Sequence, residues 1–232
     1  MRTSSQFLLE KLNIVEKIYN RIDCSSEVLD VIMPHSWRVM FMTSQLGKCL
    51  KVEENDTLTL AALLHDVGKL GISKEILFKP SALTSTEYII IHSHSHMGNI
   101  IARNIFNQAE AAVFIRDHHE RFDGKGYPRG LKGEDISLEG RIIAIVDSFD
   151  AMVFEKRNYS KNKTINKAIT ELEKHSWSQF DGYIVKEFIT LWENNTLSNN
   201  IIREVEAVIN NWLQIITERS LSRLSKGATI TQ

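Results

Sequence analysis

The sequence predicts an almost entirely α-helical protein. Apolar residues recur mainly three or four positions apart, which is the spacing of one face of a helix, while stretches that alternate polar and apolar residues are scarce. Only three of the 232 residues are proline, so few segments are barred from forming helices. With 43% apolar and 25% charged residues, the chain has the composition of an ordinary globular protein that can bury a core.

Composition also limits the function class. The formal net charge of −1 argues against a nucleic acid polymer or an anionic membrane as the main partner. No apolar run approaches the ~20 residues that span a bilayer, and the N-terminus lacks the features of a signal peptide. Cys24 and Cys49 lie in no zinc-binding or disulfide pattern. Reduced thiols of this kind predict a cytoplasmic location.

The first two predicted helices precede any obvious motif. Residues 7–22 carry apolar side chains along one stripe and predict an amphipathic N-terminal helix. After a break at residues 23–26, a second helix is predicted from about residue 27 to residue 50, bent at Pro34. His35 lies on the apolar face of this helix, so its imidazole should point inward. The apolar residues on that face are Val39, Met42 and Leu46.

A third helix is predicted from a cap at Asp56 or Thr57 to Leu64. It ends at an adjacent His-Asp pair, residues 65–66, which is followed by a glycine. Gly68 is suited to the C′ position just past a helix, where a left-handed backbone conformation is common.

Thr84 and Glu87 form a predicted capping box that opens a helix with three histidines. His94 shares a face of this helix with apolar residues, so we expect His94 to be buried. His92 and His96 fall on the other side and should be surface residues. The apolar residues on the face of His94 are Ile90, Met97, Ile101 and Ile105.

A helix from about residue 108 carries the adjacent His118 and His119 near its C-terminal end. The stretch Gly-Lys-Gly-Tyr-Pro at residues 124–128 then interrupts helical structure and predicts a rigid basic loop. A further helix, from about residue 138 to residue 154, places Asp147 on an apolar face. A carboxylate there is costly unless it meets a cation.

Three more helices are predicted at residues 164–175, 180–193 and about 198–226. The last one is amphipathic and has a wide apolar stripe. It could pack on the N-terminal helix, or the terminal helices could form a homodimer.

The inward-facing polar residues form a predicted metal site. They are His35, His65, Asp66, His94, His118, His119 and Asp147. Hydrogen bonds among these residues cannot satisfy all of them, whereas bound cations can. Seven ligands exceed one tetrahedral ion and suit two octahedral ions that share a carboxylate. Nitrogen and oxygen ligands without thiolate favour iron or manganese, with nickel, magnesium or zinc as alternatives.

Two spaced motifs carry a family resemblance. They are His65-Asp66 with Gly68-Lys69, and His118-His119-Glu120 with Gly124-x-Gly126-Tyr127-Pro128. From about His35 to Phe188 the chain resembles the HD-GYP family, which are all-α metal-dependent phosphodiesterases of the HD superfamily that hydrolyse cyclic di-GMP. The resemblance implies an HD-domain helical bundle at residues 25–195, with an extra helix at residues 1–24 and an extra amphipathic helix at residues 196–232.

The resemblance also implies roles within the site. Asp66 would bridge two metals and, with Lys69, form the catalytic pair. The first metal would take His35, His65, Asp66 and Asp147, and the second Asp66, His94, His118 and His119. The substrate phosphate would be held by Arg157, Tyr159 and Lys161.

Three departures from the family pattern stand out, one of which is Phe180-Asp181-Gly182 in place of a downstream Phe-Asp-Pro. Some members hold a third metal through a glutamate where this chain has Val31, so we expect two metals. The proline that commonly follows the phosphate-binding arginine is Asn158 here, so the contacts of this segment with the substrate can differ.

The implied reaction is hydrolysis of cyclic di-GMP to pGpG, with GMP as a further product, by a hydroxide held between the metals. One alternative is another cyclic dinucleotide, such as cyclic GMP-AMP. Another is a non-catalytic protein that senses a nucleotide or binds a partner. The basic loop, with Lys125, Arg129 and Lys132, could dock a diguanylate cyclase or other signalling protein. About thirty residues precede His35, which predicts a stand-alone enzyme or regulation by association.

Overall fold

The computed structural model describes residues 26–53, 55–154, 163–198, 201–207, 209–211 and 214. These residues form helices and connecting turns, and among them the only β-type pairing is an isolated bridge between Ser176 and Phe180. The predicted all-α class is therefore confirmed. The predicted helix at residues 7–22 and the predicted phosphate-binding residues Arg157, Tyr159 and Lys161 lie outside the described part of the chain.

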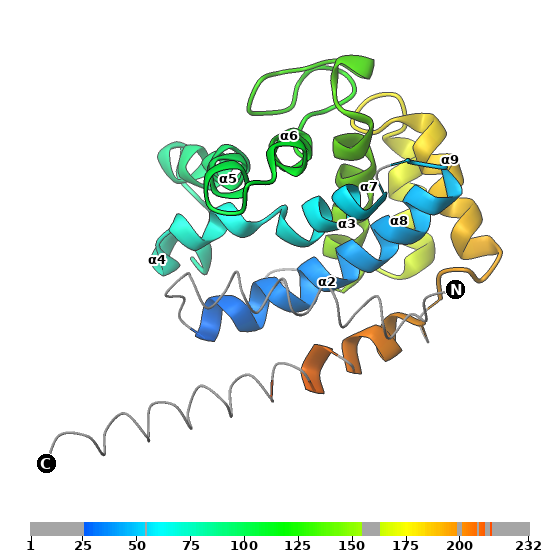
Figure 1. Cartoon of the computed structure of the whole chain (residues 1–232), viewed down its shortest axis with the longest axis horizontal. Helices are drawn as coiled ribbons and strands as arrows, with labels where there is room; N and C mark the ends of the chain where they lie inside the picture. Colours follow the sequence, from blue (N-terminus) through cyan, green and yellow to red (C-terminus); the bar gives the residue numbers. More distant parts are fainter. Residues whose placement is uncertain are drawn as a thin grey trace, which may run out of the picture.

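The helices follow one another through short connections. Their bounds are α2 Ser26–Cys49, α3 Asn55–Leu64, the 3-10 helix η1 Val67–Gly71, α4 Lys74–Leu77, α5 Ser85–Asn104, α6 Ala109–Asp117, the 3-10 helix η2 Gly133–Asp135, α7 Leu138–Val153, α8 Ile165–Lys174 and α9 Gly182–Glu193. Figure 1 shows α3 between α2 and α6, with α5 on one side of the molecule and α8 and α9 on the other.

A hydrophobic core joins α2 to α7 and α9. Trp37 of α2, Phe149 of α7 and Phe188 of α9 are fully buried within it. The rings of Phe149 and Phe188 meet edge to face, with their centroids 5.0 Å apart. Such aromatic pairs stabilise a core beyond the area they bury. The core thus fixes the two long helices, α2 and α7, that carry His35 and Asp147.

Two helix starts test the predicted caps. The capping box of α5 is confirmed, because the Thr84 hydroxyl accepts from the Glu87 amide and the Glu87 carboxylate accepts from the Thr84 amide. The predicted cap of α3 at Asp56 or Thr57 is wrong, since α3 already begins at Asn55. Asp56 lies in the first turn instead, where a negative charge still complements the helix dipole.

The predicted role of Gly68 as a helix C′ residue is also wrong. Gly68 lies inside η1 and presses directly against α5. A Cβ at Gly68 would collide with the His94 carbonyl oxygen and lie 2.7 Å from the Gly98 amide nitrogen. The absence of a side chain therefore lets η1 and α5 cross with their backbones in contact. This crossing brings His94 beside Asp66.

The buried face of α5 differs from the predicted one. His94 is buried as predicted, but Ile90, Met97 and Ile105 on its predicted face are 37–46% exposed. The residues buried with it are small or polar, namely Ser95, Gly98, Asn99 and Ala102. Close backbone contact with η1 favours small side chains at these positions, which is why an apolar stripe was a poor guide to this helix.

No helix in the described part of the chain combines the length and the apolar character needed to cross a membrane.

Candidate metal centre

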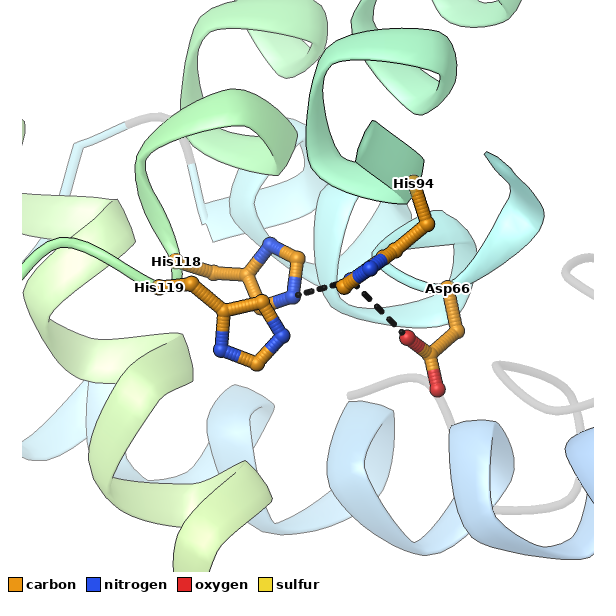
Figure 2. Close-up of side chains that lie close together, drawn as sticks. All are labelled: Asp66, His94, His118 and His119. Atoms are coloured by element: carbon orange, nitrogen blue, oxygen red, sulfur yellow. Dashed lines mark hydrogen bonds and ion pairs between the residues drawn. The ribbon is translucent and has the colours of Figure 1, made fainter. Parts of the chain in front are cut away.

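The structure brings all seven predicted ligands together in two adjacent groups. One group is His35, His65 and Asp147; the other is Asp66, His94, His118 and His119, shown in Figure 2. Within each group the potential ligand atoms all lie within 4.8 Å of one another. The ligands come from α2, α7, α5 and the segments that follow α3 and α6.

Asp66 faces both groups at once. Its Oδ2 atom lies 3.8 Å from His35 Nε2 and 3.5 Å from His65 Nε2. Its Oδ1 atom lies 3.4 Å from His94 Nε2, on the other side. A carboxylate in this position can share its two oxygens between two cations.

Backbone carbonyls fix the ring orientation of three histidines. The Nδ1–H groups of His65, His94 and His118 donate to the carbonyls of Ala62, Ile91 and Ile115, at 2.7, 2.6 and 2.5 Å. A carbonyl oxygen can only accept, so each Nδ1 must carry the proton. Each Nε2 then points into the centre and, in a neutral ring, carries the lone pair that can bind a metal, which is how histidine ligands are usually oriented.

Two features of the centre fit a bound cation. His94 Nε2 and His118 Nε2 face each other at 3.4 Å, although both carry lone pairs. Within the described part of the chain, the buried Asp66 Oδ1 has no hydrogen-bond partner. Buried acceptors are normally paired, and acceptors that converge without donors repel one another. A divalent cation satisfies all three atoms, so the residues present fit a metal.

Burial and charge separate the protonation states of the two groups. Burial lowers the pKa of His94, lowers that of His118 well below its usual range, and lowers that of His119 to about 3. These three imidazoles are therefore neutral at pH 7, as metal ligands must be.

His35 behaves in the opposite way. Burial alone would lower its pKa, but the hydrogen bonds that its ring donates to Asp147 and Asp150 outweigh burial and raise the pKa to about 10. Burial alone would also lower the pKa of His65, but the charge of Asp66 and interactions with Asp147 raise it to about 9. The facing Nε2 atoms of His35 and His65 are 3.2 Å apart, so we assign a proton to His35, which has carboxylates at both ring nitrogens. A metal entering this group must displace that proton.

The aspartates are ionised across the neutral range. Burial alone would raise the pKa of Asp66, but Lys69 and His65 hold it well below its usual range. Burial alone would also raise the pKa of Asp147, but hydrogen bonds from His35 and His65 hold it well below its usual range. Lys69 Nζ lies 2.6 Å from Asp66 Oδ2, so the predicted catalytic lysine contacts the predicted shared carboxylate.

Asp150 is a site residue to which the sequence assigned no role. Its fully buried carboxylate accepts from His35 Nδ1 at 2.7 Å, and from Arg38 Nε and Nη2 at 2.7 and 2.8 Å. Arg38 also donates to Glu206, at 3.0 Å. Asp150 follows Asp147 by three residues on α7, so helical spacing signals that it shares the inward face. Its contact with Arg38 spans 112 residues, and no local pattern shows it.

Hydrogen bonds to two buried carboxylates hold the basic loop in place. The buried Glu120 accepts from the backbone amides of Arg129 and Leu131, at 2.7 and 2.9 Å. The Arg129 guanidinium donates to the buried Asp117 at 2.8 Å, so much of its charge is engaged inside the protein. Lys125 and Lys132 are exposed.

Comparison with known proteins identifies the family. The sequence model of the HD domain matches residues 23–184, which is most of the chain. The chain belongs to the HD domain family. The predicted HD-type helical fold and the predicted family resemblance are thereby confirmed.

Several named phosphodiesterases are similar to this HD domain in sequence. A cyclic di-GMP phosphodiesterase of Thermotoga maritima is 34% identical over 195 residues, covering 82% of this chain and 53% of the relative. A 3′3′-cGAMP-specific phosphodiesterase of Vibrio cholerae is 37% identical over 172 residues, covering 72% of this chain and 39% of the relative. This HD domain thus spans about half or less of the length of these relatives.

Solved structures share the fold. A cyclic GMP-AMP-specific phosphodiesterase of V. cholerae superposes with a TM-score of 0.58 at 22% identity, covering 76% of this chain and 51% of that one. An HDG"Y"P protein of Bdellovibrio bacteriovorus superposes with a TM-score of 0.57 at 17% identity, covering 70% and 52%. At these identities the likeness is one of fold.

Proposed function

We propose that this HD domain hydrolyses cyclic di-GMP to the linear dinucleotide pGpG, with GMP as a further product. The observation that carries the proposal is the pair of ligand groups around one shared carboxylate, Asp66, with Lys69 against it. The names of the related proteins support the substrate class.

We further propose that the two groups hold two divalent cations, with iron or manganese as first candidates. The ligand set is nitrogen and oxygen without thiolate, which suits these metals. When bound, such a pair supplies a water of lowered pKa and neutralises charge on the phosphate.

The side chains of this chain then have defined roles in the proposal. The ionised carboxylates of Asp66 and Asp147 and the five imidazoles position the cations beside the scissile phosphate. The Lys69 ammonium, 2.6 Å from Asp66, stabilises the negative charge that develops on the phosphate oxygens. Arg157, Tyr159 and Lys161 are proposed to hold the second phosphate, since their segment directly follows α7, the helix that carries Asp147.

Cyclic GMP-AMP is the second candidate substrate. The V. cholerae relative that cleaves it is as similar to this chain as the cyclic di-GMP phosphodiesterases are. The metal centre would contact the phosphate, which both substrates share. A preference for one base over another therefore has to come from other residues that line the site.

The expected result is metal-dependent conversion of one or both cyclic dinucleotides to a linear product. Protein loaded anaerobically with Fe²⁺ or Mn²⁺ is incubated with cyclic di-GMP, cyclic GMP-AMP and pGpG, and the products are separated by chromatography. A chelator-treated sample is the control and should be inactive. Tight nucleotide binding without cleavage under both metals would contradict the proposal and favour a non-catalytic sensor.

We also propose a cytoplasmic location, a signalling protein as partner at the basic loop, and a homodimer. Cys49 is an exposed free thiol, which supports a reducing, cytoplasmic environment. Lys125 and Lys132 on the basic loop are exposed and available to an acidic surface on a diguanylate cyclase. The proposed homodimer through the terminal helices involves segments that lie largely outside the described residues.

A further inference from the structure

His119 is held differently from the other four histidines of the centre. Each of those four has a ring nitrogen fixed by a carbonyl or by Asp150. Among the described residues, no hydrogen bond is made by either ring nitrogen of His119, and Figure 2 shows none between His119 and Asp66, His94 or His118. A metal ligand without such a partner needs another means of orientation.

Aromatic rings surround His119 instead. The Tyr127 ring stacks on the His119 imidazole, with centroids 4.8 Å apart and planes at 30°. The His92 imidazole stacks on Tyr127 at 3.9 Å and 10°. Tyr127 therefore lies between the two histidines, and its ring stacks against both.

The Gly-Tyr-Pro loop is built to place this ring. The Tyr127 amide donates to the His119 carbonyl at 3.1 Å, which anchors the loop beside the ligand. A Cβ at Gly126 would collide with the Arg121 amide nitrogen and lie 2.6 Å from the backbone of Glu120. Only glycine lets the loop fold this tightly onto the segment after the histidine pair.

We propose that Tyr127 and His92 are positioning residues that hold the His119 imidazole by ring stacking, in place of a hydrogen bond. His92 is exposed and lies on the outer side of the stack, with the Tyr88 ring 5.8 Å away at its edge. The proposal rests on the proposed function only in taking His119 as a metal ligand.

The alternative is that the Tyr127 hydroxyl, not its ring, matters. Burial and the charges of Asp147 and Asp66 raise the pKa of this phenol, so the hydroxyl stays protonated and could donate to a ligand. Tyr127→Phe distinguishes these two explanations, because it keeps the ring and removes the hydroxyl.

The test is metal affinity measured by titration against a competing chelator, without substrate. We expect Tyr127→Leu to weaken one of the two bound metals by about 10–100-fold and leave the other unchanged, as loss of an orienting partner does. Tyr127→Phe should restore affinity to within about threefold of the unmodified protein. His92→Ala should weaken the same metal less, and His92→Phe should restore it. His96→Ala, an exposed histidine of the same helix, is the matched control and should change nothing.

Several outcomes would overturn the proposal. Tyr127→Phe losing as much affinity as Tyr127→Leu would assign the role to the hydroxyl. Unchanged affinity in both Tyr127→Leu and His92→Ala would show that the stacked rings do not contribute to metal binding.

Because His92 is exposed, His92→Ala should fold even if Tyr127→Leu does not. Metal binding without hydrolysis of any nucleotide would defeat the proposed function while leaving this test intact.

Discussion

Replacing Asp66 with alanine is expected to abolish turnover and to remove most of the metal affinity of the centre. Asp66 faces both ligand groups, with Oδ2 near His35 and His65 and Oδ1 near His94. Its loss removes a ligand from each cation and also separates Lys69 from its ion pair. We expect turnover to fall by on the order of 10³-fold or more.

The measurement is metal content and hydrolysis on the same preparation of Asp66→Ala. Asp135→Ala is the matched control, because Asp135 is an exposed carboxylate away from the centre. The control should keep the metal content and rate of the unmodified protein. Two bound metals or ordinary turnover in Asp66→Ala would show that Asp66 is not the shared ligand.

Gly68→Ala is expected to damage the centre although Gly68 carries no ligand. The added methyl group would collide with the His94 carbonyl oxygen and crowd the Gly98 amide nitrogen, so α5 must move away from η1. Overpacking of this kind typically costs about 1–3 kcal/mol, and contact with rigid backbone favours the upper end. Movement of α5 also withdraws His94 from Asp66, so metal affinity should fall as well.

Denaturant unfolding and metal titration measure both effects. Gly71→Ala is the control, since Gly71 lies in the same short helix and a Cβ there would meet nothing within 4 Å. That change should alter the free energy of unfolding by no more than about 0.5 kcal/mol. Equal behaviour of the two variants would mean that the close crossing of η1 and α5 is not required.

Much of the metal centre could be predicted because its ligands are marked locally. His35 and Asp147 lie on the inward faces of long amphipathic helices, and helical spacing finds such positions. The His-Asp and His-His pairs each directly follow the end of a helix, and both belong to spaced motifs that the sequence shows. All seven predicted ligands are accordingly brought together in the structure.

Other features depend on contacts between distant segments. Apolar neighbours on one helix face predict the burial of His94, yet the residues buried with it are small or polar and allow backbone contact with η1. Gly68 suited a helix end equally well on sequence alone, because glycine serves both left-handed turns and close approaches. The bond from Arg38 to Asp150 joins helices more than a hundred residues apart. A single sequence does not show such pairings.

The most direct test of the central claim is the metal content of anaerobically prepared protein, measured with its turnover of cyclic di-GMP. The account predicts about two Fe²⁺ or Mn²⁺ ions per chain and hydrolysis to pGpG that is lost on chelation and returns with the metal. Protein that binds two metals and cleaves no cyclic dinucleotide, or that cleaves one without metal, would contradict it.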